Sequence, residues 1–247
     1  MKFFVYLLVL TACLSAYERP PSVGEAQWDF TAPYFLPENH SAKPILDKLF
    51  SKDRPTASID ALYDAGFKKV SFNEKTGMYV MRHSKLKGYV IKLYTDDWAG
   101  VCDWCMWVKR VKGAQAIRQA IDAHGYQNNF DVPQKWVYPL PYSTYPANAI
   151  QAKDFVMLVE DSEPYDYFHN SLMWHSKLVD QARLQQFFTL LNEVGLYDSI
   201  YIDNVPFNKK GKIVFLDTEH YHEWPVPLQK VANFLTKRMA AYWFTLF

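Results

Sequence analysis

The most informative stretch of the sequence is YIDNVPFNKKGKIVFLDTE, which covers residues 201–219. Two short runs with the character of β-strands, residues 205–207 and 212–216, lie on either side of Asn208-Lys209-Lys210-Gly211. Tight hairpin turns favour Asn and Gly, because both residues tolerate a left-handed backbone. The stretch therefore predicts a β-hairpin whose turn lies at residues 208–211.

Two oxygen-bearing side chains stand at the open end of this hairpin, Asn204 on entry and Asp217 on exit. A hairpin places its two strand ends side by side, so these side chains are expected to converge. Both offer the hard oxygen ligands that Mg²⁺ prefers. Asp203 and Glu219 add negative charge, which a bound cation would relieve. The hairpin therefore predicts a magnesium site formed by Asn204 and Asp217.

Three strands are predicted well before the hairpin, at residues 69–72, 78–81 and 89–94. The third strand, YVIKLY, is rich in β-branched and aromatic residues. A turn ending at Gly77 and another ending at Gly88 separate the three strands. This region is therefore expected to form a three-stranded meander.

Helices are predicted on both sides of the meander and after it. The clearest amphipathic pattern covers residues 113–124, and a second covers residues 176–194, each followed by a glycine that can end a helix. Shorter helices are expected at residues 43–50 and 58–65, and a terminal helix at residues 228–247.

Two further strands, at residues 131–139 and 153–160, lie between the two amphipathic helices. A β-rich first part is thus followed by a helical second part that holds one hairpin. Such a segregated order predicts an α+β fold.

The order of these elements resembles the protein-kinase-like fold, with a small β-sheet N-lobe and a mainly helical C-lobe. Tyr89-Val90-Ile91-Lys92 resembles the V-A-I-K motif of that family. The resemblance makes Lys92 the lysine that contacts the phosphates of ATP, and Asn204 with Asp217 the ligands of Mg²⁺.

The resemblance also implies where the adenine ring of ATP would lie. Residues 155–160, within the strand expected at 153–160, occupy the place of the linker between the two lobes. Backbone groups of Val159, Glu160 and Asp161 would then receive the adenine ring. The implied activity is phosphate transfer from a nucleotide to a hydroxyl acceptor.

The position of the catalytic aspartate is left open between two residues. In the family an Asp precedes the metal-binding Asn by five positions, which here leads to Ser199, next to Asp198. Taking Asp203 as the catalytic residue instead would put Asn208 at the metal, although turn chemistry already explains Asn208. Asn204 is therefore preferred as the metal ligand, with Asp198 or Asp203 as the catalytic residue.

Several marks of an active kinase are missing from the sequence. Gly77 is the only glycine between the first two strands, where a glycine-rich loop belongs. No Glu lies between Lys92 and Glu160 to pair with the lysine, and Asp217-Thr218-Glu219 stands in place of Asp-Phe-Gly. A catalytically inactive kinase-like binding module is therefore the alternative to a working phosphotransferase.

The N-terminus carries the pattern of an export signal. Lys2 precedes a short apolar run at residues 3–11, which is shorter than the roughly 20 residues of a transmembrane helix. Residues 10–13, LTAC, resemble a lipobox, which would make Cys13 a lipidation site. Ordinary cleavage near residues 15–16 is the alternative, as is a buried N-terminal strand. The protein is expected to be secreted or lipid-anchored at the cell envelope.

The two remaining cysteines, Cys102 and Cys105, form the motif CDWC. Two cysteines alone cannot hold a structural zinc ion. An exported protein favours a disulfide between them, or a pair of structural thiols, over redox catalysis.

The composition limits the kind of partner. The chain has 247 residues, is 49% hydrophobic and carries a formal net charge of +1, which gives no electrostatic basis for binding nucleic acid or an anionic membrane. The aromatic content of 17% leaves a third alternative, an unrelated secreted lipoprotein that binds a protein partner through an aromatic surface.

The expected organisation has four parts. A signal peptide covers residues 1–16, an N-terminal extension 17–57, a β-rich N-lobe 58–160, and a helical C-lobe with the hairpin 161–247.

Overall fold

The computed structural model describes residues 17–144 and 149–247. The expected signal peptide and the lipidation of Cys13 fall outside these residues. No helix within the described parts of the chain is both long enough and apolar enough to cross a membrane.

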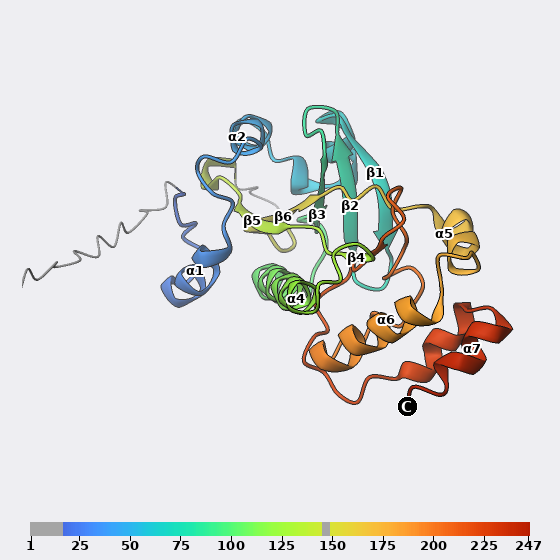
Figure 1. Cartoon of the computed structure of the whole chain (residues 1–247). Helices are drawn as coiled ribbons and strands as arrows, with labels where there is room; N and C mark the ends of the chain where they lie inside the picture. Colours follow the sequence, from blue (N-terminus) through green and yellow to red (C-terminus); the bar gives the residue numbers. More distant parts are fainter. Residues whose placement is uncertain (1–16, 145–148) are drawn as a thin grey trace, which may run out of the picture.

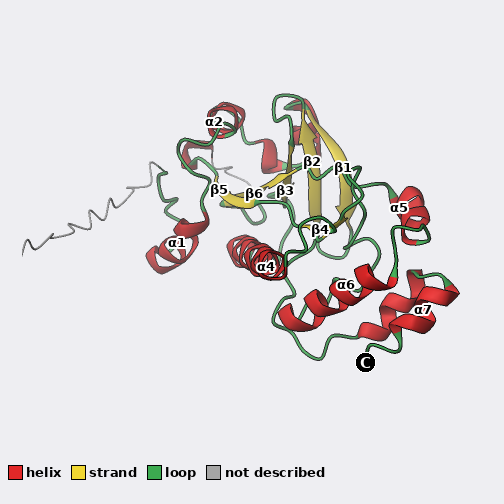
Figure 2. Ribbon diagram, viewed as in Figure 1, coloured by secondary structure: helices red, strands yellow, loops and turns green. Residues whose placement is uncertain are grey.

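A five-stranded antiparallel sheet forms the first part of the molecule, with strand order β1-β2-β3-β6-β5 (Figures 1 and 2). Its strands are β1 (Phe67–Asn73), β2 (Met78–His83), β3 (Tyr89–Leu93), β5 (Lys135–Pro139) and β6 (Phe155–Glu160). The predicted meander is confirmed as β1 to β3, and the α+β class is confirmed with it. The two later strands begin a few residues after their expected starts at positions 131 and 153.

Both faces of the sheet are covered, because side chains alternate between the faces along each strand. On one face, Ile91 and Leu158 pack with α2 (Lys43–Phe50) and α3 (Ile59–Asp64). Both of these helices were predicted, and Ser58 caps α3 by accepting a hydrogen bond from the backbone of Ala61 at 3.1 Å.

On the opposite face, Val90, Met157 and Val159 pack with α1 (Glu25–Thr31) and with the first half of α4 (Asp103–His124). The segment expected to be an N-terminal extension is therefore part of the sheet core, since Val23 is buried on this face and Leu46 and Phe50 are buried on the other.

The helix predicted at residues 113–124 begins ten residues earlier, because α4 starts at Asp103. Its first half buries Trp107 and Val111 under the sheet, and its second half buries Ile117 and Ile121 in a different core. The buried side of α4 changes along its length, so a search for one continuous apolar stripe finds only the second half.

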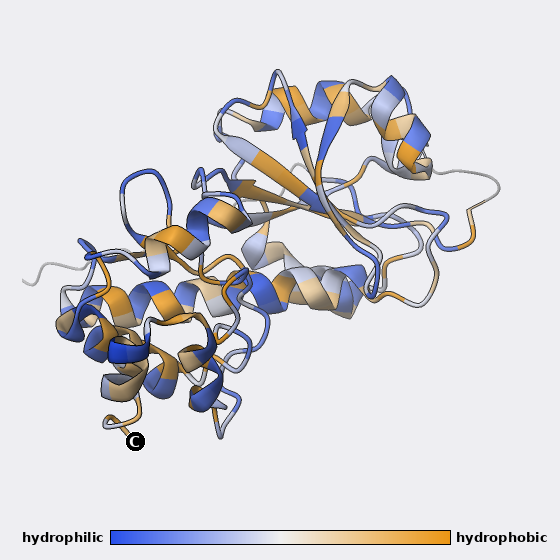
Figure 3. Ribbon diagram, turned by 90° about the vertical axis from the view of Figure 1, so that its right-hand side faces the viewer, coloured by the Kyte–Doolittle hydropathy of each residue, from blue (hydrophilic) through white to orange (hydrophobic). Residues whose placement is uncertain are grey.

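That second core belongs to the helical part of the chain, which contains α5 (Tyr167–Trp174), α6 (Gln181–Val194) and α7 (Lys237–Trp243). Figure 3 shows polar and apolar positions alternating around these helices. In Figures 1 and 2, α4 lies between the sheet and α6.

Two helix predictions in this part need correction. The helix expected from residue 176 starts at Gln181, because Asp180 caps it by accepting from the backbone of Arg183 at 2.8 Å. The single terminal helix is divided into a 3-10 segment, Leu228–Phe234, and α7. Thr236 separates them, since it is extended and caps α7 through the backbone of Met239.

The predicted hairpin is present with very short strands. Asn208 N donates to Lys212 O at 2.9 Å, Val214 N to Pro206 O at 2.8 Å, and Leu216 N to Asn204 O at 3.0 Å. The second strand of the hairpin contains β7 (Ile213–Val214), which pairs in parallel with β4 (Phe130–Asp131).

Candidate functional site

A pocket of about 700 Å³ lies between the sheet and the hairpin. Its walls come from four places: the first three strands, the turn between β1 and β2, the segment that follows β6, and the hairpin. The lining residues that matter most are Asn73, Lys75, Val80, Arg82, Val90, Lys92, Val159, Glu160, Asp161, Ser162, Asp203, Asn204, Leu216 and Asp217.

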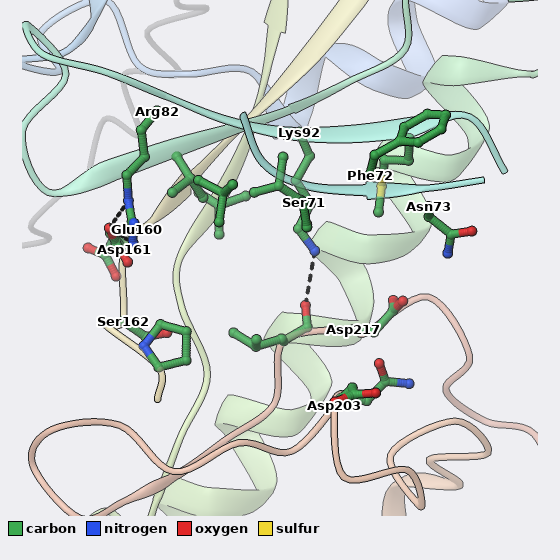
Figure 4. A pocket seen from close by; sticks show the side chains of 18 of the residues that line it. Ser71, Phe72, Asn73, Arg82, Lys92, Glu160, Asp161, Ser162, Asp203 and Asp217 are labelled. Carbon is green, nitrogen blue, oxygen red and sulfur yellow. Dashed lines mark hydrogen bonds and ion pairs between the residues drawn. The ribbon is translucent and has the colours of Figure 1, made fainter. Parts of the chain in front are cut away.

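Most residues singled out in the sequence meet in this pocket. Lys92, Val159, Glu160, Asp161, Asp203, Asn204 and Asp217 all line it. Figure 4 shows the two ends of the pocket: Arg82, Glu160 and Asp161 lie at one end, and Asp203 and Asp217 lie toward the other, with Lys92 between them.

Asp198 lies outside the set of lining residues. Its carboxylate is 3.5 Å from Nε2 of His220, and its backbone carbonyl accepts a hydrogen bond from Nδ2 of Asn204 at 2.9 Å. Of the two candidate catalytic aspartates, Asp203 is the one whose side chain borders the pocket. Asp198 instead supports Asn204.

The hairpin positions Asn204 and Asp217 as its sequence predicts. The hydrogen bond between Leu216 N and Asn204 O brings Asp217, the next residue, beside Asn204. Asn208 serves the turn, because its Oδ1 accepts from the backbone N–H groups of Lys210 and Lys212 at 3.0 Å each. Asn208 is therefore a turn residue, and a metal-binding role for Asn204 stays a prediction.

Lys92 lies on β3 on the same face as Val90, where α4 covers the sheet. Its Nζ donates to the carbonyl of Leu216 at 3.4 Å, across the pocket wall (Figure 4). The pKa of Lys92 is lowered to about 8, chiefly by burial and then by the nearby charge of Arg110, against the opposing effect of Asp217. An anionic ligand beside Lys92 would favour its charged form.

Arg110 on α4 is a site residue that sequence reasoning missed. Its Nη1 is 2.5 Å from Oδ1 of Asp217, and its Nη2 is 2.6 Å from Oε2 of Glu219. The contact with Asp217 is a hydrogen bond, whereas that with Glu219 has ion-pair distance without hydrogen-bond geometry. Arg110 thus takes the carboxylate that was expected to bind a metal.

The pKa values of the two carboxylates move in opposite directions. Burial raises the pKa of Asp217, but the charges of Arg110, Lys92 and Lys135 outweigh it and hold the pKa below its usual value. For Glu219, burial outweighs the charge of Arg110, and the negative charge of Asp217 adds to the effect, so the pKa is raised. Asp217 is therefore the more acidic of the two carboxylates.

Lys135 on β5 is a second residue that the sequence did not reveal. It is 1% exposed, and its Nζ donates to Leu216 O at 3.2 Å and to Oγ1 of Thr218 at 2.7 Å. Burial lowers its pKa well below the usual lysine value, and the charge of Lys92 adds to this. The available signal was a lysine at a core position of an otherwise apolar strand, flanked by two prolines.

At the end of β6 and just after it, some backbone N–H groups already have hydrogen-bond partners. Glu160 N donates to Gln134 O at 3.0 Å and Asp161 N donates to Gly88 O at 2.8 Å, so these two N–H groups are already bonded. The Asp161 carboxylate pairs with Arg82 at 2.6 Å. Among the described residues, none accepts the backbone N–H of Ser162, which lies next along the same wall.

The fit of a metal ion depends on the carboxylates at the hairpin end. Within residues 17–144 and 149–247, no three His, Cys, Asp or Glu side chains are grouped closely enough to hold a metal ion. Asp203 and Asn204 border the pocket on the same side as Asp217, but Asp217 is bound by Arg110. The residues present therefore fit Mg²⁺ poorly.

Cys102 and Cys105 are joined by a disulfide at the start of α4. The disulfide borders a separate hollow of about 390 Å³, which Asp103 and Asp154 also line. It is therefore placed to hold the first turn of the helix that carries Arg110.

No known protein family matches the chain, and no curated protein matches its sequence. The geometry of the pocket is therefore the basis for a function.

Proposed function

We propose that the pocket binds a nucleotide in a protein-kinase-like arrangement, with the base near the segment after β6 and the phosphates near Lys92. The observation that carries the proposal is that Lys92 and Asp217, far apart in the sequence, border one pocket. Under this proposal the sheet acts as the small lobe and the helical part as the large lobe.

Part of the pocket wall toward β6 is apolar, which suits a flat base. Val80 and Val90 line it from the sheet, Val159 from β6, and Leu216 from the hairpin. Ligand sites commonly combine such apolar walls with a few polar groups that fix orientation. The free N–H of Ser162 would supply one such group at the edge of the base.

The other end suits phosphate. Lys92 is buried between the sheet and the hairpin, and Lys75 lines the pocket from the turn between β1 and β2. Oδ1 of Asn73 accepts from the backbone N–H groups of Lys75 and Thr76, which fixes the shape of this turn. The turn would cover the phosphates as the glycine-rich loop does in kinases.

The contacts of Asp217 and Lys92 favour nucleotide binding over catalysis. The Arg110–Asp217 pair removes the carboxylate that would coordinate Mg²⁺, and Lys92 donates to a backbone carbonyl and has no helix glutamate as partner. Phosphate transfer stays a second candidate on one observation: Asp203, the possible partner of an acceptor hydroxyl, borders the pocket. Export, lipidation and a protein partner stay predictions.

The proposal is tested by thermal unfolding with and without ADP or ATP. At a nucleotide concentration one hundred times Kd, binding stabilises the folded state by about 2.7 kcal/mol, which raises Tm by several degrees. Lys92→Met should abolish the rise. Lys68→Met, which removes an exposed lysine from β1, is the matched control and should keep it. A wild-type protein whose Tm no nucleotide changes would overturn the proposal.

Catalysis is tested separately with γ-labelled ATP. If the protein transfers phosphate, Asp203→Asn should abolish the label and preserve ADP binding, because Asp203 borders the pocket from the exposed side of the hairpin. If wild type transfers no label to itself, to water or to an added protein substrate such as casein, the phosphotransferase candidate is rejected and binding alone remains.

A further inference from the structure

We infer that Arg110 replaces the divalent cation at this site, so that the pocket holds a nucleotide without Mg²⁺. The inference rests on the proposed nucleotide binding and adds a property to it. In kinase-like sites a metal ion joins the aspartate to the phosphates. Here a guanidinium is already bound to that aspartate.

Arg110 pairs with Asp217 from the enclosed side, since its side chain is only 2% exposed while that of Asp217 is 23% exposed. The arginine is enclosed between α4, the sheet and the hairpin, and a guanidinium stays protonated at any physiological pH. A metal ion would have to compete with a buried charge at 2.5 Å from the same carboxylate. Such competition weakens metal binding strongly, because the two cations repel each other in a poorly solvated place.

The segment that carries Asp217 cannot easily move toward a metal. Oγ1 of Thr218 donates to the backbone carbonyl of Arg110 at 2.6 Å, and Lys135 donates to Thr218 from the other side. A Cβ atom at Gly113 would lie 1.7 Å from the carbonyl oxygen of Thr218, so the glycine permits a very close approach of the two backbones. Asp217 is thereby fixed against α4.

The charges around Asp217 favour an anion. Two carboxylates, Asp217 and Glu219, face Arg110, Lys92 and Lys135. The local balance is not negative even if Lys135 is uncharged, which suits a phosphate group and disfavours a second cation. Asp203 is the remaining carboxylate of the hairpin side, and it is exposed to solvent.

The first experiment measures metal binding without any nucleotide. Mn²⁺ is titrated into the protein and free Mn²⁺ is followed by electron paramagnetic resonance. Wild type should bind no Mn²⁺ at concentrations below about ten times the protein concentration. Arg110→Gln combined with Glu219→Gln, which leaves Asp217 as a free carboxylate, should gain a site. Stoichiometric Mn²⁺ binding by wild type that Asp217→Asn abolishes would overturn the inference.

The second experiment measures the affinity for ADP by calorimetry, once with excess Mg²⁺ and once with EDTA. Wild type should give Kd values that agree within threefold. The double variant should bind ADP at least tenfold more tightly with Mg²⁺ than with EDTA. A tenfold improvement by Mg²⁺ in wild type would overturn the inference while supporting the proposed function.

The two experiments also separate this inference from the proposed function. Absence of ADP binding in both conditions would overturn nucleotide binding itself, and this inference with it, whatever the Mn²⁺ result. If the double variant does not fold, the wild-type titrations still decide, because both of their outcomes are specified. Circular dichroism of each variant shows whether it is folded.

Discussion

Two buried arginine–carboxylate pairs hold different parts of the molecule, and the carboxylate of one of them lines the pocket between the sheet and the hairpin. Arg54 binds Asp96 beside the sheet through Nε at 2.9 Å and Nη2 at 3.1 Å. Arg110 binds Asp217 between α4 and the hairpin at 2.5 Å. Both arginines are almost fully enclosed, with 7% and 2% of their side chains exposed.

The two pairs differ in how exposed their carboxylates are. Asp96 is 1% exposed and also accepts from Oγ1 of Thr56 at 3.1 Å and from the backbone of Lys153 at 2.7 Å, so both of its oxygens have protein partners. Asp217 is 23% exposed and faces the pocket. Of the two pairs, Arg110–Asp217 is the one whose carboxylate remains accessible to a ligand.

The largest expected effect separates the two pairs by stability. Asp96→Ala leaves the Arg54 guanidinium buried without its carboxylate, which should lower the free energy of unfolding by about 3–5 kcal/mol. The proposed ADP binding of the folded fraction should stay unchanged, since the Arg54–Asp96 pair is not among the residues that line the pocket of Lys92 and Asp217. Denaturant unfolding measures the loss, and Asp97→Ala, at the exposed neighbouring position, is the control. A lost ADP affinity in Asp96→Ala would show that the closed pair also serves the pocket.

The second effect concerns Asp103, a buried carboxylate held by backbone N–H groups at the start of α4. Burial, and then the charge of Asp154, raise the pKa of Asp103 from 3.8 to about 6. The folded state therefore binds this proton more tightly than the unfolded state. The resulting stability is fully present below pH 4 and is lost as the pH rises through 6, a change of about 3 kcal/mol.

Denaturant unfolding at pH 4 and pH 7 checks this expectation. From pH 4 to pH 7, wild type should lose about 3 kcal/mol of unfolding free energy relative to Asp103→Asn. Because other carboxylates are common to both proteins, their titration cancels in the difference. A difference that does not change with pH would contradict the raised pKa.

The third effect tests how tightly α4 approaches the hairpin. Gly→Ala in an exposed helix stabilises by about 1 kcal/mol. Gly113→Ala should instead destabilise by about 1–3 kcal/mol, because the new methyl group meets the Thr218 carbonyl. Gln115→Ala, at an exposed position of the same helix, should change stability by less than about 0.5 kcal/mol. A stabilised Gly113→Ala protein would mean that the segment of Asp217 moves freely.

The smallest effect is expected at the exposed pair between Arg82 and Asp161. Its Arg82 side chain is 49% exposed, so the ion pair is screened by solvent. Arg82→Ala should change the unfolding free energy by less than about 1 kcal/mol. Lys68→Ala on the neighbouring strand is the control for loss of a surface charge. A larger loss of unfolding free energy would mean that the Arg82–Asp161 pair stabilises the fold as strongly as a buried pair does.

The sequence predicts those parts of the site that depend on neighbours along the chain. The turn at Asn208 follows from the preferences of Asn and Gly, and the hairpin then brings Asn204 to Asp217. Lys92 was singled out because Tyr89-Val90-Ile91-Lys92 resembles the V-A-I-K motif, and β3 itself was predicted because it is rich in β-branched and aromatic residues. The meander was found for the same reason.

Arg110 and Lys135 were missed because their partners are distant in sequence. Arg110 lies 107 residues from Asp217, and nothing in its own neighbourhood marks it as buried. The first half of α4 was missed with it, since its apolar positions face the sheet while those of the second half face the helical core. Tertiary packing, which local patterns do not record, decides both cases.

Helix α4 belongs to two cores at once, with Trp107 in one and Ile117 in the other. Pulling the sheet away from the helical part would expose one of these side chains to water, at a cost of several kcal/mol. The molecule should therefore lose its structure in one all-or-none step. A ligand bound in the pocket would then also stabilise residues that it does not contact, because α4 runs through both cores.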